Sequence, residues 1–158
     1  MFHPYTVALF GHRQLDNALQ VEQRLEGLLR KLLCTHAQVD FLIGRNGEFD
    51  LLAASVIRRV RRDFDARGAA LILILPYLTA EFRDNEAEFL RYYDSIEVFP
   101  TPPGRPQRAC IPLRNRAMID RADAVICCLD RASGGSYEAA AYALTRHKPL
   151  LHAGTLCC

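Results

Sequence analysis

The sequence predicts a single Rossmann-like three-layer αβα domain spanning residues 1–158, built on a mainly parallel β-sheet. Short apolar segments rich in β-branched residues alternate with segments whose apolar residues recur every three or four positions. The short segments are apolar throughout rather than at every second residue, which is typical of parallel strands covered on both faces by helices. A length of 158 residues suits one domain with a substantial hydrophobic core.

Six segments are predicted to be strands because they combine aliphatic and β-branched residues with flanking turn residues. They span residues 6–10, 39–43, 69–75, 95–99, 124–129 and 149–152. The third is the most apolar and is stopped by Pro76. Cys127 and Cys128 lie inside the fifth strand, where a cysteine usually behaves as a small buried hydrophobic residue.

Two helices are predicted between the first three strands, from their apolar spacing and from polar residues that can cap them. Asp16 or Asn17 can cap the first helix. Its recurring apolar positions are Ala18, Val21, Leu25, Leu28, Leu29 and Leu32. Asp50 is placed to cap the second helix. The buried stripe of that helix is expected to be Ala53, Val56, Ile57, Val60 and Phe64.

Three further helices are expected in the second half of the chain. They cover residues 82–93, the segment that Pro112 opens, and residues 137–145. The inward-facing residues of the middle one are expected to be Met118, Ile119 and Ala122. The proline-rich segment 100–106 breaks all regular structure and is expected to form a loop over one edge of the sheet.

The composition is that of an ordinary globular domain. The formal net charge of +2 is too small to indicate a nucleic-acid partner on its own. No apolar run is long enough to span a membrane, and the N-terminus lacks the pattern of a secretion signal. None of the six cysteines forms a C-x-x-C motif, and the terminal Cys157-Cys158 pair is expected to be exposed and prone to oxidation. We therefore expect a cytoplasmic protein without structural disulfides, membrane partner, metal or other cofactor.

A cluster of arginines ends the second predicted helix. Its members are Arg58, Arg59, Arg61 and Arg62. Their charges interact favourably with the negative end of the helix dipole, so a solvated face is the preferred interpretation. A nucleic-acid-binding patch is the alternative.

Three glycine-bearing loops are predicted to leave the same edge of the sheet. In an open parallel sheet, ligands bind outside the carboxyl ends of the strands, near the point where the strand order reverses. The loops after the first, second and fifth strands contribute Gly11, His12, Arg13, Gly44, Arg45, Gly47, Glu48, Gly134, Gly135 and Ser136. The last loop opens a helix, whose unpaired N–H groups suit a phosphate or another anion. Neither G-x-G-x-x-G nor G-x-x-x-x-G-K-[ST] occurs, so no standard dinucleotide site or P-loop is predicted.

Arg114, Asn115 and Arg116 are predicted to lie in the first turn of the helix that Pro112 opens. Exposed cations in a first turn oppose the helix dipole at a cost of typically ~0.3–1 kcal/mol each. Residues placed against a local preference are often functional, and an anion held between Arg116 and the Gly134-Gly135-Ser136 turn would offset the cost. The alternative is a salt bridge from Arg116 to one of three acids, Asp120, Asp123 and Asp130.

The order and spacing of these motifs resemble the SLOG superfamily. The matching motifs are Gly11-His12-Arg13, Gly47-Glu48-Phe49-Asp50, Arg114-Asn115-Arg116-Ala-Met118-Ile-Asp120 and Gly134-Gly135-Ser136 with Tyr142-Ala143. The resemblance runs from Thr6 to His152 and is greatest to the YspA/YpsA-like proteins, formerly a domain of unknown function. The superfamily also includes the LOG cytokinin-activating phosphoribohydrolases and the DNA-processing protein A fold. The resemblance implies a Rossmann-like sheet that binds a nucleotide or a nucleotide-derived ligand such as ADP-ribose, often as a homodimer.

The resemblance also implies roles for individual residues. In LOG enzymes a Gly-Gly-x-Gly-Thr turn binds phosphate, and an arginine and a glutamate support cleavage of an N-glycosidic bond. Gly134, Gly135 and Ser136 match the start of that turn, and Arg116 matches the arginine. If Tyr142-Ala143 aligns with the usual Glu-Tyr-Ala of YpsA-like proteins, the acidic position is occupied by Ala141.

Cleavage of an N-glycosidic bond would need another carboxylate near the anomeric carbon. Glu138, three residues before Ala141 on the same helical face, or Glu48 could supply it, although both also suit helix N-termini. His12 could act at neutral pH or orient a ligand.

The preferred function is a sensor or regulatory domain that binds a nucleoside monophosphate or an ADP-ribose-type ligand. The first alternative is a phosphoribohydrolase-like enzyme using Arg116 and Glu138, and the second is nucleic-acid binding through the arginine cluster. Residues 76–110 depart most from any recognisable motif pattern and are expected to form a lid, a dimer contact or a partner surface.

Overall fold

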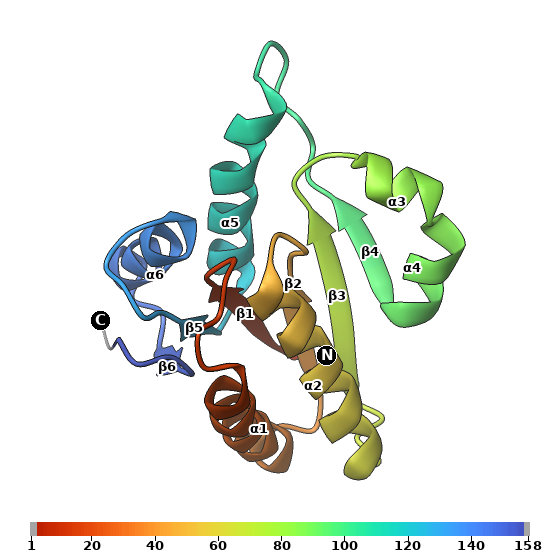
Figure 1. The fold of residues 1–158 in the computed structure, drawn as a ribbon. Coiled ribbons are helices and arrows are strands. Elements are labelled where there is room, and N and C mark those ends of the chain that lie inside the picture. The colour runs from red at the N-terminus through yellow and green to blue at the C-terminus, as the bar shows by residue number, and fades with distance from the viewer. Residues whose placement is uncertain (1–2, 157–158) are drawn as a thin grey trace.

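The protein folds around a six-stranded, all-parallel sheet in the order β4-β3-β2-β1-β5-β6 (Figure 1). The structure is a computed structural model, which describes residues 3–156. The strands are β1 (Tyr5–Gly11), β2 (Val39–Ile43), β3 (Ala69–Leu75), β4 (Ser95–Val98), β5 (Ala124–Cys128) and β6 (Leu150–His152). The predicted Rossmann-like αβα fold with a parallel sheet is confirmed, and Cys127 and Cys128 are buried as expected. The Cys157-Cys158 pair lies outside the described residues.

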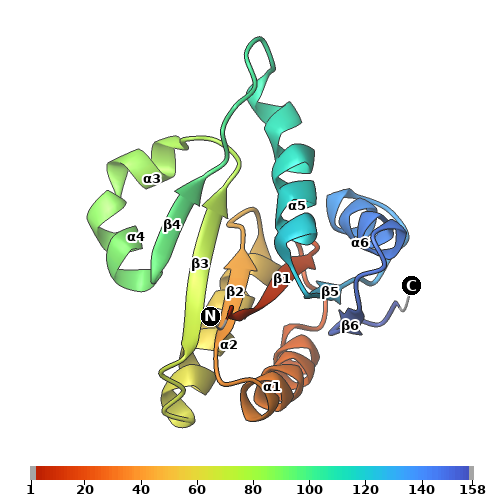
Figure 2. The same cartoon turned by 180° about the vertical axis from the view of Figure 1, so that it is seen from behind.

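Helices cover both faces of the sheet. They are α1 (Ala18–Thr35), α2 (Glu48–Asp63), α3 (Ala80–Asp84), α4 (Glu86–Tyr92), α5 (Cys110–Arg121) and α6 (Gly135–Thr145), with one 3₁₀ turn, η1 (Gln107–Ala109). Helices α1 and α2 lie side by side over one face, and α5 and α6 cover the other (Figures 1 and 2). The short helices α3 and α4 lie beside the β4 edge.

Two apolar layers separate the sheet from its helices. The layer under α1 and α2 includes Leu25, Phe41, Phe49 and Ile57, each no more than 1% exposed. The opposite layer joins alternate residues of the central strands to Met118 and Ile119 of α5 and to the small residues of α6. Burying both faces explains why the strands are apolar throughout.

The order of the strands places a crevice at the centre of the sheet. From β1 the chain builds outward through β2, β3 and β4, and it then crosses to add β5 and β6 on the other side of β1. The strand order therefore reverses between β1 and β5, and the carboxyl ends of these two strands are where ligands bind in open parallel sheets. The proline-rich loop between β4 and α5 projects beyond the sheet at this end (Figure 2).

Several predicted helix boundaries are wrong. Segment 82–93 is two short helices, because the backbone turns at Asn85, where φ is −129°. Helix α5 begins at Cys110 rather than at Pro112, with η1 leading into it. The N-cap of α2 is Gly47, so Asp50 lies inside its first turn. Phe64 follows the end of α2 and is 41% exposed, with the guanidinium carbon of Arg30 5.0 Å from its ring centre.

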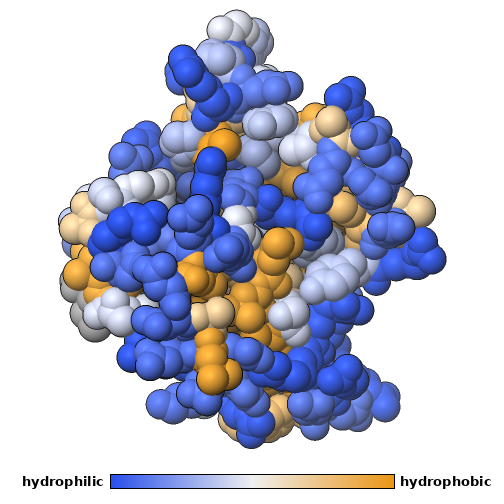
Figure 3. Space-filling model, viewed as in Figure 1, coloured by the Kyte–Doolittle hydropathy of each residue, from blue (hydrophilic) through white to orange (hydrophobic). Residues whose placement is uncertain are grey.

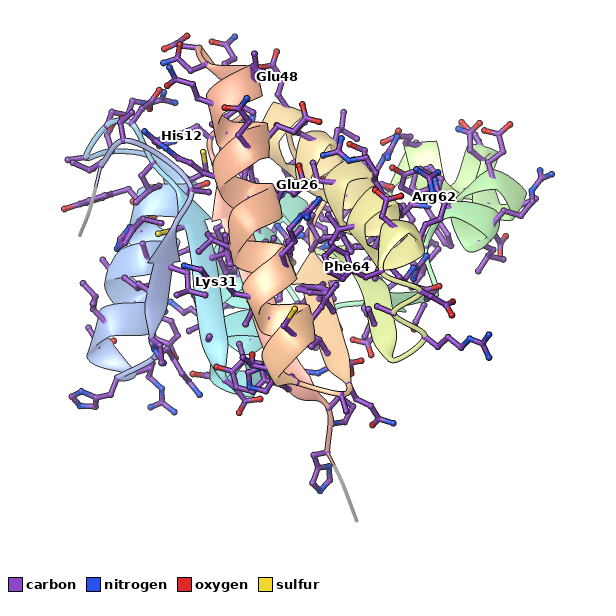
Figure 4. All side chains as sticks on the ribbon, turned by 90° about the horizontal axis from the view of Figure 1, so that it is seen from below. His12, Glu26, Lys31, Glu48, Arg62 and Phe64 are labelled. Atoms are coloured by element: carbon purple, nitrogen blue, oxygen red, sulfur yellow. The ribbon has the colours of Figure 1, made fainter. Side chains whose placement is uncertain are left out.

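The arginine cluster at the end of α2 is engaged by the protein itself. Arg59 pairs with Glu22 and Glu26 of α1 at 2.5 and 3.3 Å, and Figure 4 shows Glu26 on the side of α1 that faces α2. Arg61 pairs with Asp94, and Arg62 with Asp63 at 3.5 Å. The guanidinium of Arg58 lies 4.1 Å from the ring centre of Tyr92. Nucleic-acid binding through this face is therefore not favoured.

The surface over α1 and α2 is mostly hydrophilic and carries a limited apolar area (Figure 3). The large apolar side chains of these two helices that are more than one-third exposed are Leu19 and Leu51. Within residues 3–156, no helix is long and apolar enough to cross a membrane.

Candidate functional site

A pocket of about 290 Å³ opens where the carboxyl ends of β1 and β5 meet. The predicted residues that line it are Gly11, His12, Arg13, Gly44, Arg114, Asn115, Gly134, Gly135 and Ser136. They come from four separate parts of the chain: the loops after β1, β2 and β5, and the helix α5. The fold thus brings together nine of the predicted site residues at the point where the strand order reverses.

The amino terminus of α6 forms one wall of this pocket. Its N-cap is Gly134, whose φ of +92° is a left-handed conformation that glycine adopts without strain. The N–H groups of its first turn have no acceptor within the helix, and no side chain of residues 3–156 caps them. The Ser136 hydroxyl donates to the carbonyl oxygen of Gly11 at 2.5 Å and ties α6 to the end of β1. Free N–H donors and a positive dipole end both favour an anion.

Arg114 supplies a buried cation to the same pocket. Its side chain donates from Nη1 to the carbonyl oxygen of Ile74 at 2.7 Å and from Nε to Oδ1 of Asn115 at 3.0 Å. The residue is only 3% exposed, and burial lowers the pKa of its guanidinium to about 10, against the opposing charge of Asp50. It remains charged at neutral pH, and among the described residues its hydrogen bonds are made by Nε and Nη1, which leaves Nη2 available to a ligand.

The prediction that residues 114–116 lie in a first turn is wrong. Because α5 begins at Cys110, these residues lie in its second turn, and the dipole argument does not apply to them. What is unusual about Arg114 is its burial, and a buried charge needs compensation.

Asp50 provides part of that compensation. Its Oδ2 accepts a hydrogen bond from the Asn46 N–H at 2.8 Å. Burial raises the pKa of this carboxyl, while the Asn46 bond and the charge of Arg114 act in the opposite direction. With Arg13 and Arg131 also lining the pocket, three arginines face one aspartate, and the pocket has an excess of positive charge.

Three predicted residues between β2 and the start of α2 do not line the pocket and have structural roles instead. Arg45 turns toward α3 and α4, where it bonds to Glu81 at 3.0 Å and to the Tyr93 hydroxyl at 3.1 Å. Gly47 begins α2, and the N–H of the next residue, Glu48, donates to the Arg13 carbonyl oxygen at 2.8 Å. The Glu48 carboxylate accepts from the Leu15 N–H at 2.6 Å. Gly47 and Glu48 thus fix the β1–α1 loop.

His12 is buried and lines both this pocket and a second one. Its Nε2 lies 3.2 Å from Oδ1 of Asp130, yet this nitrogen has no hydrogen bond of acceptable geometry to any residue from 3 to 156. Burial lowers the pKa of the ring and the charge of Arg131 adds to this, whereas the charge of Asp130 and a backbone hydrogen bond with Arg131 raise it. The imidazole is therefore neutral at pH 7.

We expect the free energy of unfolding to fall as the pH drops from 7.5 to 5.5. In this window His12 of the unfolded chain takes up a proton near its ordinary pKa, whereas the folded state resists protonation. One such group changes the free energy by at most about 1.4 kcal/mol per pH unit. Denaturant titrations at several pH values give the free energy of unfolding as a function of pH. This free energy should change less with pH in His12→Gln than in the wild type, and as much as in the wild type in the exposed control His3→Gln. Equal slopes for wild type and His12→Gln would contradict the expectation.

Arg116 and Glu138 lie together in a smaller groove of about 80 Å³ between α5 and α6. This groove adjoins the main pocket, because Ile111, Asn115 and Gly135 line both. The Arg116 guanidinium carbon lies 5.4 Å from the ring centre of Tyr142. Within the described chain, the Arg116 side chain forms no salt bridge to Asp120, Asp123 or Asp130, the alternative that the sequence offered. The fold brings this pair together, but beside the main pocket rather than in it.

Sequence reasoning missed two charged residues of the main pocket. Asp50 was interpreted as a helix cap, and its proximity to Arg114 depends on how α2 and α5 pack. Arg131 follows directly after Asp130 at the end of β5, and its position after a predicted strand was a usable signal. Within residues 3–156, no group of three or more His, Cys, Asp or Glu side chains is arranged to hold a metal ion.

Solved structures of other proteins share this fold. DNA processing protein A from Streptococcus pneumoniae superposes with a TM-score of 0.67 at 16% identity, over 94% of this chain and 50% of that one. DNA processing protein A from Helicobacter pylori, described by its single-stranded DNA binding mode, gives 0.66 at 20% identity, over 94% and 65%. The molybdenum cofactor carrier protein of Chlamydomonas reinhardtii gives 0.60 at 12% identity, over 97% and 79%.

These similarities place the protein among proteins with a Rossmann-like fold. The Rossmann-like fold that the resemblance to the SLOG superfamily implies is confirmed, at identities that establish the fold alone. The chain spans about half the length of the Streptococcus pneumoniae protein. No model of a known protein family matches the sequence, and neither does any curated protein.

Proposed function

We propose that the pocket between β1 and β5 binds the phosphate of a nucleotide or of a nucleotide-derived small molecule. The observation that carries the proposal is the buried guanidinium of Arg114 beside the uncapped amino terminus of α6. Burying the Arg114 cation costs free energy, and the first N–H groups of α6 point to the same pocket. A bound anion would compensate the buried charge and accept hydrogen bonds from these N–H groups. The exposed arginines Arg13 and Arg131 add positive charge at the mouth.

The structural neighbours support a ligand-binding role. One is described by its binding of single-stranded DNA and another as a carrier of a molybdenum cofactor. We place this chain with small-molecule binders rather than with DNA-binding proteins because the arginine cluster of α2 is already paired internally. A sensor or regulatory role in the cytoplasm, as a homodimer, is part of this proposal.

A second candidate is a phosphoribohydrolase-like enzyme. The observation that favours it is the groove that Arg116 and Glu138 share next to the phosphate pocket. In this alternative, the sugar attached to a phosphate at α6 extends into that groove rather than toward β5, and Glu138 could stabilise developing positive charge at the anomeric carbon.

We expect nucleoside monophosphates or ADP-ribose to raise the melting temperature. A ligand at 100 times its Kd stabilises the folded state by about 2.7 kcal/mol. Gly135→Val should abolish this effect, because the new side chain lies at the pocket wall while no other atom lies within 4 Å of the added Cβ. Gly27→Val, at an equally open position remote in α1, is the matched control.

The same samples are assayed for released base or ribose phosphate. Stabilisation without release supports the binding role. Release that Glu138→Ala abolishes supports the enzyme instead. A wild-type protein that none of these ligands stabilises would contradict the proposal.

A further inference from the structure

A second cavity lies on the other side of His12. It has a volume of about 200 Å³ and lies between the start of α1, the end of β5 and the segment after β6. Its polar lining includes His12, Asp16, Gln20, Arg24, Asp130 and Thr155. Because His12 lines both cavities, they are neighbours along the carboxyl edge of the sheet. Together they fall in the size range of small-molecule sites, roughly 300–1,000 Å³.

The two cavities differ in charge. The main pocket has three arginines and one aspartate, whereas the second cavity has two aspartates, Asp16 and Asp130, and one arginine. That arginine, Arg24, donates from Nη1 to the carbonyl oxygen of Gly154 at 2.9 Å, so one of its donors is committed to the protein. A ligand that occupies both cavities therefore has an anionic end and an end without negative charge.

His12 indicates that something polar belongs in this second cavity. The residue is 4% exposed, and its Nε2 is a buried nitrogen without a hydrogen-bond partner among the described residues. Leaving such a group unsatisfied costs about 1–3 kcal/mol. Nε2 lies 3.2 Å from Oδ1 of Asp130, which lines the second cavity and not the first. A hydroxyl group that lies beside this pair, on the cavity side, could bond to both atoms.

We infer that the second cavity is a sugar subsite, in which Asp130 and His12 bind the ribose hydroxyls of the nucleotide whose phosphate occupies the main pocket. The inference rests on the proposed function. A carboxylate can accept from two hydroxyls at once, and a neutral imidazole nitrogen can complete the set as donor or acceptor. Acidic side chains bind the ribose 2′-hydroxyl in the same way in dinucleotide-binding folds. The Cys128 thiol at this cavity stays protonated, because burial and the charge of Asp130 raise its pKa to about 11.

Calorimetric titrations with inorganic phosphate, AMP and 2′-deoxyAMP test the inference on the wild-type protein. We expect AMP to bind at least ~10-fold more tightly than 2′-deoxyAMP, because the deoxy ligand leaves the buried Nε2 of His12 without a partner. Asp130→Asn should reduce this preference to less than ~3-fold without weakening the binding of phosphate, because Asp130 pairs with the pocket arginine Arg131 at 3.4 Å and its loss leaves that cation free for an anion. Asp84→Asn, an exposed substitution in α3 far from both cavities, should behave as wild type.

The outcomes separate the sugar subsite from the phosphate pocket. Equal affinities for AMP and 2′-deoxyAMP, with phosphate still bound, would overturn the sugar subsite alone. Loss of phosphate binding in Asp130→Asn would also overturn it, because the carboxylate would then support the anion pocket. If neither phosphate nor AMP binds the wild-type protein, the proposed function fails and the sugar subsite fails with it.

Discussion

Replacing Gly11 with alanine is expected to destabilise the protein by about 3 kcal/mol, near the upper end of overpacking effects. A Cβ at this position would lie 2.1 Å from Cγ and 2.6 Å from Cβ of Phe49. Phe49 is fully buried in the layer under α1 and α2, so its ring has no free space to enter. Movement of Phe49 would displace the start of α2 and with it the loop that forms the pocket. Urea titrations monitored by circular dichroism measure the loss.

A double-mutant cycle identifies the contact. Phe49→Ala alone should cost about 3–5 kcal/mol, as is usual for a buried phenylalanine. Combined with Gly11→Ala it should cost less than the sum, because the added methyl then enters the space left by the ring. Gly27→Ala, at an open position within α1, should instead be neutral or stabilise by up to about 1 kcal/mol. Strict additivity, or a harmless Gly11→Ala, would show that the close approach does not constrain the folded state.

Gly11 also shows which features of the fold the sequence can predict and which it cannot. The strand that ends there was predictable as residues 6–10, since this segment is mostly apolar and rich in β-forming residues and a turn follows. The reason for glycine was not visible, because Phe49 is 38 positions away and the contact depends on how α2 packs on β1. Local pattern thus predicts elements and the edge at which loops meet, but not which side chain approaches which backbone atom.

Arg114 and Arg116 illustrate the same difference between what local sequence predicts and what packing decides. The sequence places Arg114 and Arg116 beside the glycine loops, and both reach the carboxyl edge of the sheet. Arg114 is buried because it lies four residues before Met118, on the face of α5 that packs against the sheet. Arg116 is two residues further along, a rotation of about 200° around the helix axis, and is exposed. The resemblance to LOG enzymes directed attention to Arg116, whereas the predicted inward face of this helix already pointed to Arg114. Charge pairing across elements, such as Asp50 with Arg114, is set by packing alone.

Arg114→Met is expected to weaken the binding of AMP or phosphate by about 100-fold or more, since losing one partner of a buried charged contact usually costs 2–5 kcal/mol. Arg114→Lys keeps the charge but not the planar donor set, and should lose about 10-fold. Arg116→Met removes an exposed cation that lies outside the main pocket and should change affinity by less than about 3-fold.

Arg114→Met alone leaves Asp50 without its nearby cation, which is destabilising in itself. The double variant Arg114→Met with Asp50→Asn removes both charges, and its melting temperature should lie above that of Arg114→Met. If the double variant is folded and still fails to bind AMP, the loss reflects the missing guanidinium rather than a damaged fold. A larger loss from Arg116→Met than from Arg114→Met would move the anion site into the groove between α5 and α6, where Glu138 lies, and would favour the enzyme over the sensor.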